Sequence, residues 1–437
     1  MTSAHAQEPF DHHSPRFAER WPEIYAGMRT RCPVGQSPQH GGFYAVTRYD
    51  DVRRVLQEPE TFASGRELEF DGRIVGGATV PVTASRLGMM EMDPPASLIY
   101  RRLIAPYFSA RTVREYVPRL TTIVDWILDR TIESGRMDVV GDLGAMLPPL
   151  VIVDLLGLPL ERWQHYAHAL HQGAGHVKGS ARAIVGVMRE MRELVAEWRA
   201  RGAGPPGVCT ALLEAEVDGR PIDDDLVAEL VFMLLTGGVD TTTAQISNVV
   251  EHLDAHPGLR LRLIEDPDAV PSATDELLRL YSPGTGAART VVAPTTLGDV
   301  ALRPGDRLFL GIGSANRDET VFPDAETVDP DRSNAHKHVA FGLGVHRCVG
   351  AYLARAELVE VVRAVLRRMP DFAIDREALV HRPIIPLVNG WTVMPIRFTP
   401  GPRVVPEHLA PLPCRTAVQP DRPRDLAPPD RSSARHA

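Results

Sequence analysis

Apolar residues recur every three or four positions through the middle of the chain, which is the pattern of helices that bury one face. The pattern predicts helices over residues 110–134, 146–156 and 180–201. The longest candidate begins after Pro221 with three aspartates, which suit a helix N-terminus because carboxylates meet free N–H groups there. It continues to His256 and gives about 50 Å of helix, long enough to cross a whole domain.

Shorter segments elsewhere alternate between apolar and polar residues, as strands do. One lies near residue 43, ahead of a short helix, and the others lie between residues 289 and 313. Residues 71–90 are rich in Gly, Val and Thr and show no clean period, which predicts a long loop that forms part of a binding pocket. The sequence therefore predicts a mainly α fold with small β-sheets.

Composition narrows the class of protein. The chain has 437 residues, of which 44% are hydrophobic, so it can bury a large core. We expect one domain over residues 1–405, with about the first 15 residues flexible, and a disordered Pro- and Arg-rich tail over residues 406–437. A formal net charge of −8 argues against a nucleic-acid partner.

Cysteine usage and the N-terminus indicate the compartment. The four cysteines lie far apart and form no CxxC pair, so neither a disulfide framework nor a zinc ribbon is indicated. The N-terminus lacks the pattern of a signal peptide, and no window approaches an uninterrupted apolar run of membrane-spanning length. We expect a cytoplasmic protein that does not enter a membrane.

The segment FGLGVHRCVG carries the most specific chemistry. Cys348 stands just ahead of a predicted helix and beside Arg347, and a helix N-terminus and nearby cations both favour a thiolate. The residues allow a structural cysteine, a zinc site with His336, His338 and His346, or haem iron held by one axial cysteine. The glycines of the segment let backbone pass close to something large and flat, which favours a bulky cofactor over a bare ion.

This segment resembles the haem-binding signature of the cytochrome P450 family of haem-thiolate monooxygenases, through Phe341, Gly342, Gly344, His346, Cys348 and Gly350. The resemblance implies a haem b between a long central helix and the helix after the cysteine loop. Cys348 would be the axial ligand of the iron, and Phe341, His346 and Gly350 would belong to the cofactor site. The resemblance extends from about Phe43 to Arg397, with five motifs in the family's order.

The centre of the predicted long helix reads GGVDTT, residues 237–242. Two adjacent glycines each cost a helix roughly 1 kcal/mol relative to alanine, and taken alone they indicate a kink. The Thr241 hydroxyl is placed to bond the carbonyl of Gly237, four residues back. The segment resembles the family's oxygen-activating groove, in which Asp240 and Thr241 would deliver protons to dioxygen. It departs from the family in having Gly237 where many members have alanine.

Glu276 and Arg279 lie three residues apart and share one helix face, where an isolated pair would form a weak surface ion pair. The resemblance implies instead a buried network with Arg332, behind the cysteine loop. Ala325 and Val328 stand where a proline and an aromatic residue are commoner in the family.

The resemblance also assigns cations to the two haem propionates, namely Arg101, Arg289 and His346. Charge-assisted hydrogen bonds to carboxylates explain these residue types. Ser97 stands where the family usually has a histidine, so one propionate would be held more loosely or by another group.

The implied activity is the insertion of one oxygen atom from O2 into a hydrophobic substrate, by hydroxylation or epoxidation. Electrons would come from a ferredoxin and its ferredoxin reductase, with the protein acting as a monomer. Candidate pocket segments mix apolar residues with few charges, which favours a terpenoid or polyketide-like secondary metabolite over a sugar or an ion. These segments are residues 71–90, 168–184, 232–241, 284–288 and 384–387, and a basic docking patch would comprise Arg102, Arg111, Arg114 and Arg347.

Other functions stay open at this point. One is a non-hydroxylating haem-thiolate enzyme that uses peroxide or couples rings, in which the acid–alcohol pair is often altered. Another is a haem-thiolate module that binds a gas or a ligand without turnover, which would not need the proton delivery of Asp240 and Thr241. A zinc hydrolase is a more remote third possibility.

Overall fold

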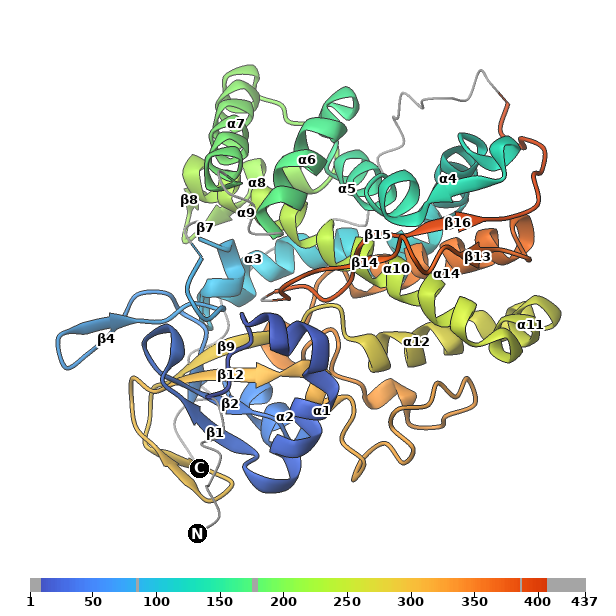
Figure 1. Cartoon of the computed structure of the whole chain (residues 1–437). Helices are drawn as coiled ribbons and strands as arrows, with labels where there is room; N and C mark the ends of the chain where they lie inside the picture. The colour runs from blue at the N-terminus through green and yellow to red at the C-terminus, as the bar shows by residue number, and fades with distance from the viewer. Residues whose placement is uncertain (1–8, 84–85, 175–179, 386, 407–437) are drawn as a thin grey trace, which may run out of the picture.

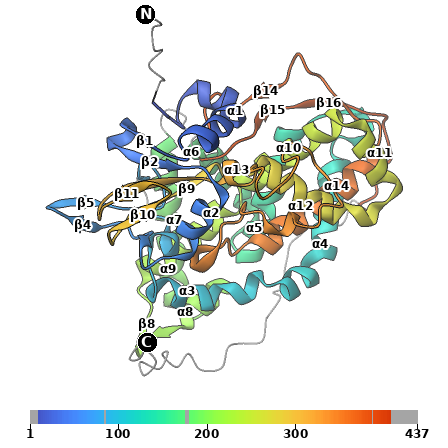
Figure 2. The same ribbon diagram turned by 90° about the horizontal axis from the view of Figure 1, so that it is seen from below.

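The structure is a computed structural model that describes residues 9–83, 86–174, 180–385 and 387–406. Helices make up most of it, and a β-rich part lies to one side of them (Figures 1 and 2). The α-helices are α1 (Pro15–Arg31), α2 (Tyr49–Gln57), α3 (Ala96–Ile104), α4 (Ala110–Asp129), α5 (Leu147–Leu156), α6 (Trp163–Ala174), α7 (Ser180–Arg201), α8 (Val208–Glu214), α9 (Asp224–Gly237), α10 (Asp240–Ala255), α11 (Pro257–Glu265), α12 (Val270–Tyr281), α13 (Ile312–Ala315) and α14 (Ala351–Arg368).

The strands form one five-stranded sheet, in the order β1-β2-β12-β9-β3, and several smaller sheets. The strands are β1 (Val34–Ser37), β2 (Phe43–Val46), β3 (Phe62–Ala63), β4 (Leu68–Phe70), β5 (Arg73–Val75), β6 (Arg136–Asp138), β7 (Glu216–Val217), β8 (Arg220–Pro221), β9 (Gly286–Val291), β10 (Thr295–Leu297), β11 (Val300–Leu302), β12 (Arg307–Gly311), β13 (Ala373–Ile374), β14 (Val380–His381), β15 (Trp391–Val393) and β16 (Pro395–Arg397). The mainly α fold with small β-sheets is therefore as predicted.

The five-stranded sheet joins the N-terminal strands to strands from the second half of the chain. β12 runs parallel to β2 and antiparallel to β9. Because successive side chains point to opposite faces, Leu308 and Leu310 pack into one apolar cluster and Phe309 into another. The sheet is thus buried on both faces, which holds β9 firmly in place.

The helical core forms around α9, α10 and α14. α14 buries one apolar face at Leu358, Val361, Val362 and Val365, and it packs against α4, α10 and α12. Two apolar helical stretches, Val139–Leu156 and Asp224–Ala255, are long enough to cross a membrane, but 67% of each is buried inside the protein. Such burial is what the core helices of a globular protein show.

The predicted 50 Å helix is interrupted, and the prediction of one continuous helix is wrong at that point. Asp223 caps α9 as expected, with its side chain accepting from the N–H groups of Asp225 and Leu226, but α9 ends at Gly237. Val239 has φ −105° and ψ −75°, and α10 begins at the next residue. Gly238 fits here because a Cβ would lie only 3.0 Å from the Ile152 side chain of α5. The packing against α5 and the two glycines together interrupt the hydrogen bonds of the helix.

The loop predicted over residues 71–90 is only partly irregular. Residues 73–75 form β5, which pairs with β4 in a hairpin that projects from the body (Figure 1). Ile74 in the middle of β5 is 72% exposed, so this part does not line a pocket. The chain then returns to the core, where Gly88 packs against Met233 of α9, while residues 84 and 85 lie outside the described residues.

The predicted flexible N-terminus and disordered tail fall mainly on residues 1–8 and 407–437, which lie outside the described residues. From residue 9 onward the N-terminal segment contacts the rest of the protein. The Ser37 hydroxyl donates to the Phe10 carbonyl at 2.6 Å, and Ser14 caps α1.

Candidate functional site

The cysteine loop places Cys348 just before α14. Its backbone N–H donates to the Phe341 carbonyl at 2.8 Å, which closes the loop, and its side chain is exposed at the site. Burial among protein atoms raises the pKa of the thiol, while the Gly350 N–H, Arg101 and Arg347 act in the opposite direction. The helix N-terminus and the nearby cations that the sequence pointed to thus favour a thiolate against the effect of burial, and a bound metal would favour it further.

Two glycines of this loop are required by the backbone itself. Gly344 has φ +66°, and a Cβ there would lie 2.5 Å from the Leu56 carbonyl oxygen at the end of α2. Gly342 also has a left-handed φ, +65°. Both positions therefore favour glycine for the turn, and Gly344 also for the close approach of α2.

Three basic side chains from distant segments meet beside the cysteine loop: Arg101 of α3, Arg289 of β9 and His346. Burial lowers the pKa of Arg289 to about 10 and, together with the charges of Arg289 and Arg101, that of His346 to about 3. Burial also lowers the pKa of Arg101, whose charge interacts with Cys348. The two arginines thus bring positive charge to the site at the cost of desolvating it, and with burial they keep His346 neutral; an anionic ligand would relieve this cost.

Two buried polar atoms in this region have no hydrogen-bond partner among the described residues. They are His346 Nε2 and Ser97 Oγ, and Ser97 as a whole is only 3% exposed. Buried polar groups are ordinarily hydrogen-bonded. Two such atoms without a partner, close to arginines, therefore indicate a hydrogen-bond acceptor from outside the chain. A haem with two propionates fits these residues: Cys348 would hold its iron, and the basic side chains and Ser97 its carboxylates.

The zinc interpretation of the same loop is not supported by the geometry. Burial lowers the pKa of His338 to about 4, and its Nδ1 accepts from the Ala340 N–H at 3.2 Å. Within the described part of the chain, ligand atoms close enough to share an ion occur at His12, His13 and His40 instead. His336, His346 and Cys348 are not in that group.

Glu276, Arg279 and Arg332 form one buried network, as the resemblance implied. Arg279 Nε and Arg332 Nε donate to the two carboxylate oxygens of Glu276, each at 2.7 Å, and Glu276 and Arg279 are fully buried. Burial alone raises the pKa of Glu276, but the hydrogen bonds from both arginines outweigh it and hold the pKa below its ordinary value. The network fastens α12 to the chain around residues 316–332, ahead of the cysteine loop.

The break between α9 and α10 opens the core at Gly237 and Thr241. Gly237 is exposed although buried residues lie on both sides of it along the chain. Thr241 Oγ1 lies 3.5 Å from the Gly237 carbonyl oxygen, a contact too long to hold the hydroxyl firmly. Thr241 therefore has a hydroxyl free to serve another group in the open space.

Asp240 is linked to two residues that sequence reasoning missed. His171 Nδ1 of α6 lies 2.8 Å from Asp240 Oδ1, and Arg382 Nη2 lies 3.7 Å from the same oxygen. His171 lies in the predicted pocket segment 168–184, but nothing in the sequence pointed to Arg382. The structure makes Asp240 the centre of a charged cluster between α6, α10 and the segment before β15.

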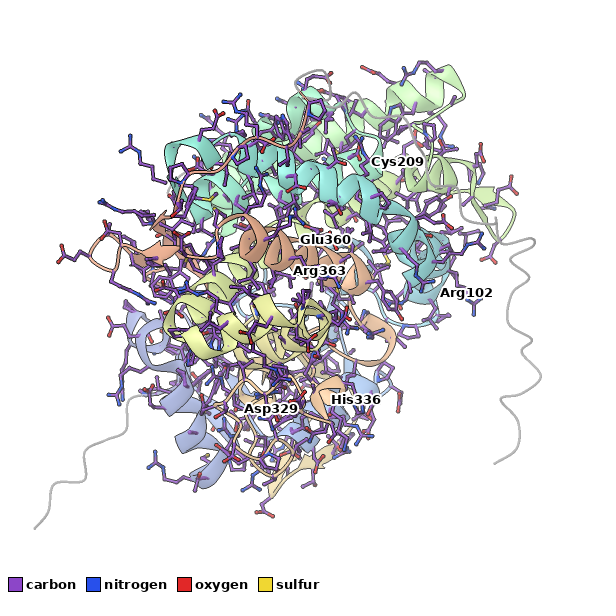
Figure 3. The ribbon with its side chains drawn as sticks, turned by 90° about the vertical axis from the view of Figure 1, so that its right-hand side faces the viewer. Arg102, Cys209, Asp329, His336, Glu360 and Arg363 are labelled. Atoms are coloured by element: carbon purple, nitrogen blue, oxygen red, sulfur yellow. The ribbon has the colours of Figure 1, made fainter. Side chains whose placement is uncertain are left out.

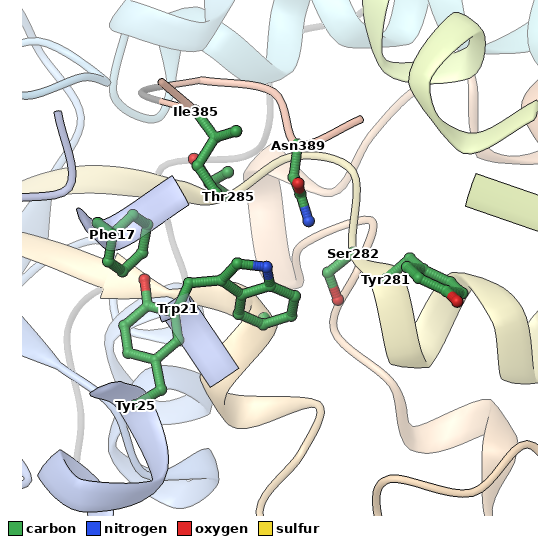
Figure 4. A pocket seen from close by; sticks show the side chains of 9 residues that line it. Phe17, Trp21, Tyr25, Tyr281, Ser282, Thr285, Ile385 and Asn389 are labelled. Carbon is green, nitrogen blue, oxygen red and sulfur yellow. The ribbon is translucent and has the colours of Figure 1, made fainter. Parts of the chain in front are cut away.

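The predicted pocket segments contact one another through described residues. The Ala288 N–H of β9 donates to the Ala78 carbonyl at 2.8 Å, and the Thr285 N–H donates to the Leu387 carbonyl at 3.1 Å. A small cavity lies beside the second contact, between α1 and the end of α12 (Figure 4). Phe17, Trp21, Tyr25, Tyr281, Ser282, Thr285, Gly313, Ile385 and Asn389 line it. Residues 175–179 and 386 of the predicted segments lie outside the described residues.

Comparison with known proteins agrees with this geometry. Residues 177–370 match the family model described as Cytochrome P450. The chain is 33% identical over 390 residues to a steroid C26-monooxygenase of Mycolicibacterium smegmatis, covering 88% of this chain and 94% of that protein. It is 32% identical over 395 residues to the mycinamicin IV hydroxylase/epoxidase of Micromonospora griseorubida, covering 86% and 94%.

Solved structures show the same likeness. The cytochrome P450 CYP268A2 of Mycobacterium marinum, in complex with pseudoionone, matches with a TM-score of 0.81 and 28% identity, over 91% of this chain and 100% of that chain. A mutant of P450 EryK in complex with erythromycin B matches with a TM-score of 0.79 and 27% identity, over 90% and 99%.

Proposed function

Because this chain belongs to the cytochrome P450 family and is a monooxygenase that uses haem b and O2, we propose that it hydroxylates or epoxidises a terpenoid- or polyketide-like molecule. In this proposal the electrons come from a ferredoxin and its reductase, and the enzyme acts as a monomer in the cytoplasm. The observation that carries the proposal is the free Thr241 hydroxyl beside the Asp240 cluster at the break in the core helix.

The chain's own residues would hold the cofactor and manage its charge. When bound, the haem would supply an iron that activates O2. Cys348 would provide its thiolate ligand, while Arg101, Arg289 and His346 would bind the propionates. Ser97 would donate its buried hydroxyl to one carboxylate in place of the family's usual histidine, because its Oγ has no partner among the described residues.

Asp240 and Thr241 would pass protons into the site from the side of α6. Asp240 Oδ1 accepts a hydrogen bond from Nδ1 of His171, whose Nε2 is buried. Once the Asp240 carboxylate has taken up a proton, rotation of the carboxylic acid would hand that proton toward the Thr241 hydroxyl. Because the acid Asp240 and the alcohol Thr241 are both present, activation of O2 by proton delivery is favoured over the peroxide-driven alternative.

The substrate class rests on the apolar lining of the predicted segments and on the relatives. Met89, Phe232, Ala288 and Ile385 are buried apolar residues of four different segments. The relatives are named for a steroid and for mycinamicin IV, and the solved structures contain pseudoionone and erythromycin B. A hydrophobic molecule is thus a better candidate than a sugar or an ionic metabolite.

The proposed ferredoxin would dock on the basic patch that comprises Arg102, Arg111, Arg114 and Arg347. All four side chains are exposed, and Figure 3 shows Arg102 at the periphery of the molecule. Arg111 also pairs with Glu115 at 3.2 Å, which reduces the contribution of Arg111 to the positive potential of the patch. An acidic partner would be steered to this surface most strongly at low ionic strength.

The test is reconstituted turnover under 18O2 with a panel of terpenoid and macrolide compounds, with sugars and organic acids as controls. We expect one labelled oxygen atom in the product, with electrons delivered by ferredoxin and reductase. Arg102→Glu with Arg111→Glu should raise the apparent KM for ferredoxin steeply at low salt, and Arg397→Glu, at an exposed position of β16 outside this patch, should not. Turnover with peroxide alone, or labelled product only from the control compounds, would refute the proposal.

A further inference from the structure

Three histidines meet where the N-terminal segment crosses the five-stranded sheet. His12 and His13 directly precede α1, and His40 lies in the tight turn between β1 and β2 (η1, Gln39–Gly41). One ring nitrogen from each lies within 4.8 Å of the others. Figure 1 shows this N-terminal part, in dark blue, beside β2 and β12. The cluster is remote in sequence from every residue of the haem site.

The outer nitrogens of these imidazoles face groups that only accept hydrogen bonds. His12 Nε2 and His13 Nε2 lie 2.7 and 3.2 Å from the Val80 carbonyl oxygen, and His40 Nε2 lies 3.1 Å from Asp11 Oδ1. Each Nε2 must therefore carry the proton, which leaves the lone pair on Nδ1. Histidines that bind metals are oriented in this way, with the outer N–H donated to a carbonyl or a carboxylate.

One of these Nδ1 atoms has no partner among the described residues. His12 is 0% exposed, and its Nδ1 is buried without a hydrogen bond to the described residues. The ring stacks on Phe309 at 4.1 Å between centroids, which fixes its direction. A buried acceptor with no donor is uncommon in folded proteins, and a cation would satisfy it.

We propose that His12, His13 and His40 bind one divalent transition-metal ion of the kind that imidazole prefers, such as Zn²⁺. Three neutral imidazoles and one water complete a tetrahedral site, and the His40 side chain, 20% exposed, leaves a path for the ion and the water. Asp11 supplies the negative charge next to the ligands and orients His40.

The ion would fasten three separate segments to each other. It would join the N-terminal segment to the β1–β2 turn and, through the Val80 carbonyl, to the stretch that the Ala78 carbonyl connects to Ala288 of β9. Because the ion binds the folded chain and not the unfolded one, it raises the melting temperature. The role is structural, and the ion does not touch the reacting groups.

The test is equilibrium dialysis of the haem-loaded, full-length protein against micromolar Zn²⁺, followed by metal analysis of zinc relative to iron. We expect one zinc per iron in the wild type. His40→Asn should abolish this zinc, because asparagine tolerates the left-handed φ of +52° at this position but lacks the imidazole. His256→Asn, which removes an exposed histidine elsewhere, should keep it.

Two further measurements keep the result interpretable. Asp11→Asn should weaken zinc binding by about 10–100-fold, as loss of an outer carboxylate does. Zn²⁺ should raise the melting temperature of the wild type and leave that of His40→Asn unchanged. No bound zinc in the folded wild type, or equal zinc in the wild type and His40→Asn, would overturn the proposal.

Discussion

Replacing Arg279 by methionine tests the buried network most directly. Arg279 is fully buried and donates two hydrogen bonds to Glu276 and three to the carbonyls of Asn316, Ala325 and Thr327, at 2.7–3.0 Å. Methionine fills much of the same volume but donates to none of them. Glu276 keeps Arg332 as its ion-pair partner, so the carboxylate does not become an isolated charge.

The expected loss of stability is large. Removing one partner of a buried ion pair costs about 3–5 kcal/mol, and the remaining Arg332 contact favours the lower end of that range. The carbonyls of Asn316 and Ala325 lose their donor and add about 1 kcal/mol each, while that of Thr327 still accepts from Arg332 Nη2, so a total of about 5 kcal/mol is expected. Single domains are stable by only about 5–15 kcal/mol, so little folded, haem-loaded Arg279→Met protein should accumulate.

The assay combines the carbon monoxide difference spectrum, which counts correctly ligated haem, with the urea midpoint of whatever protein folds. Arg279→Lys keeps the charge but cannot form the forked contact, so it should fall between the methionine variant and the wild type. Arg262→Met, which removes an exposed pair with Asp331, should behave as the wild type. An Arg279→Met protein within about 1 kcal/mol of the wild type would refute the reasoning, since that difference is below the cost of a broken buried pair.

Three further predictions concern Thr241, the charged cluster around Asp240, and the dependence of stability on pH. Thr241→Ala should retain haem and the urea midpoint, because the 3.5 Å contact to Gly237 is weak, but it should divert electrons to hydrogen peroxide; Thr241→Ser should restore coupling. His171→Phe should slow coupled turnover and change its solvent isotope effect while substrate binding stays, whereas a structural role alone would alter the melting temperature instead. The stabilisation that the Glu276 network provides should be complete above the ordinary glutamate pKa of 4.5. It should disappear as the pH falls through the lower pKa that Glu276 has in the folded protein. Glu276→Gln should therefore flatten the acid side of a plot of stability against pH.

Local patterns in the sequence predicted the elements that local physics controls. The cap at Asp223 and the shared helix face of Glu276 and Arg279 both follow from helix geometry, and the structure has both of them. The cysteine loop was recognisable because its chemistry is concentrated in ten residues. Such features need no knowledge of distant contacts.

What the sequence did not reveal depends on contacts across the fold. The break after Gly237 needs Ile152 of α5 to explain it, and the requirement for Gly344 comes from the Leu56 carbonyl of α2. The partners of Asp240 were missed because His171 and Arg382 lie far from it along the chain. No periodicity connects such positions, so only the folded chain shows them together.

The parallel pairing of β2 with β12 also bears on how the protein is made. Tyr44 pairs with Leu308, so the first strands leave the ribosome long before their partner exists. At typical rates of synthesis the delay is on the order of ten to fifty seconds, during which the β1–β2 hairpin exposes an unpaired edge. Arg289 and Cys348 emerge at the end of the same interval, so haem can be captured only by a nearly complete chain. Chaperone demand and cofactor supply should therefore limit the yield of active enzyme together, at one late step of biogenesis.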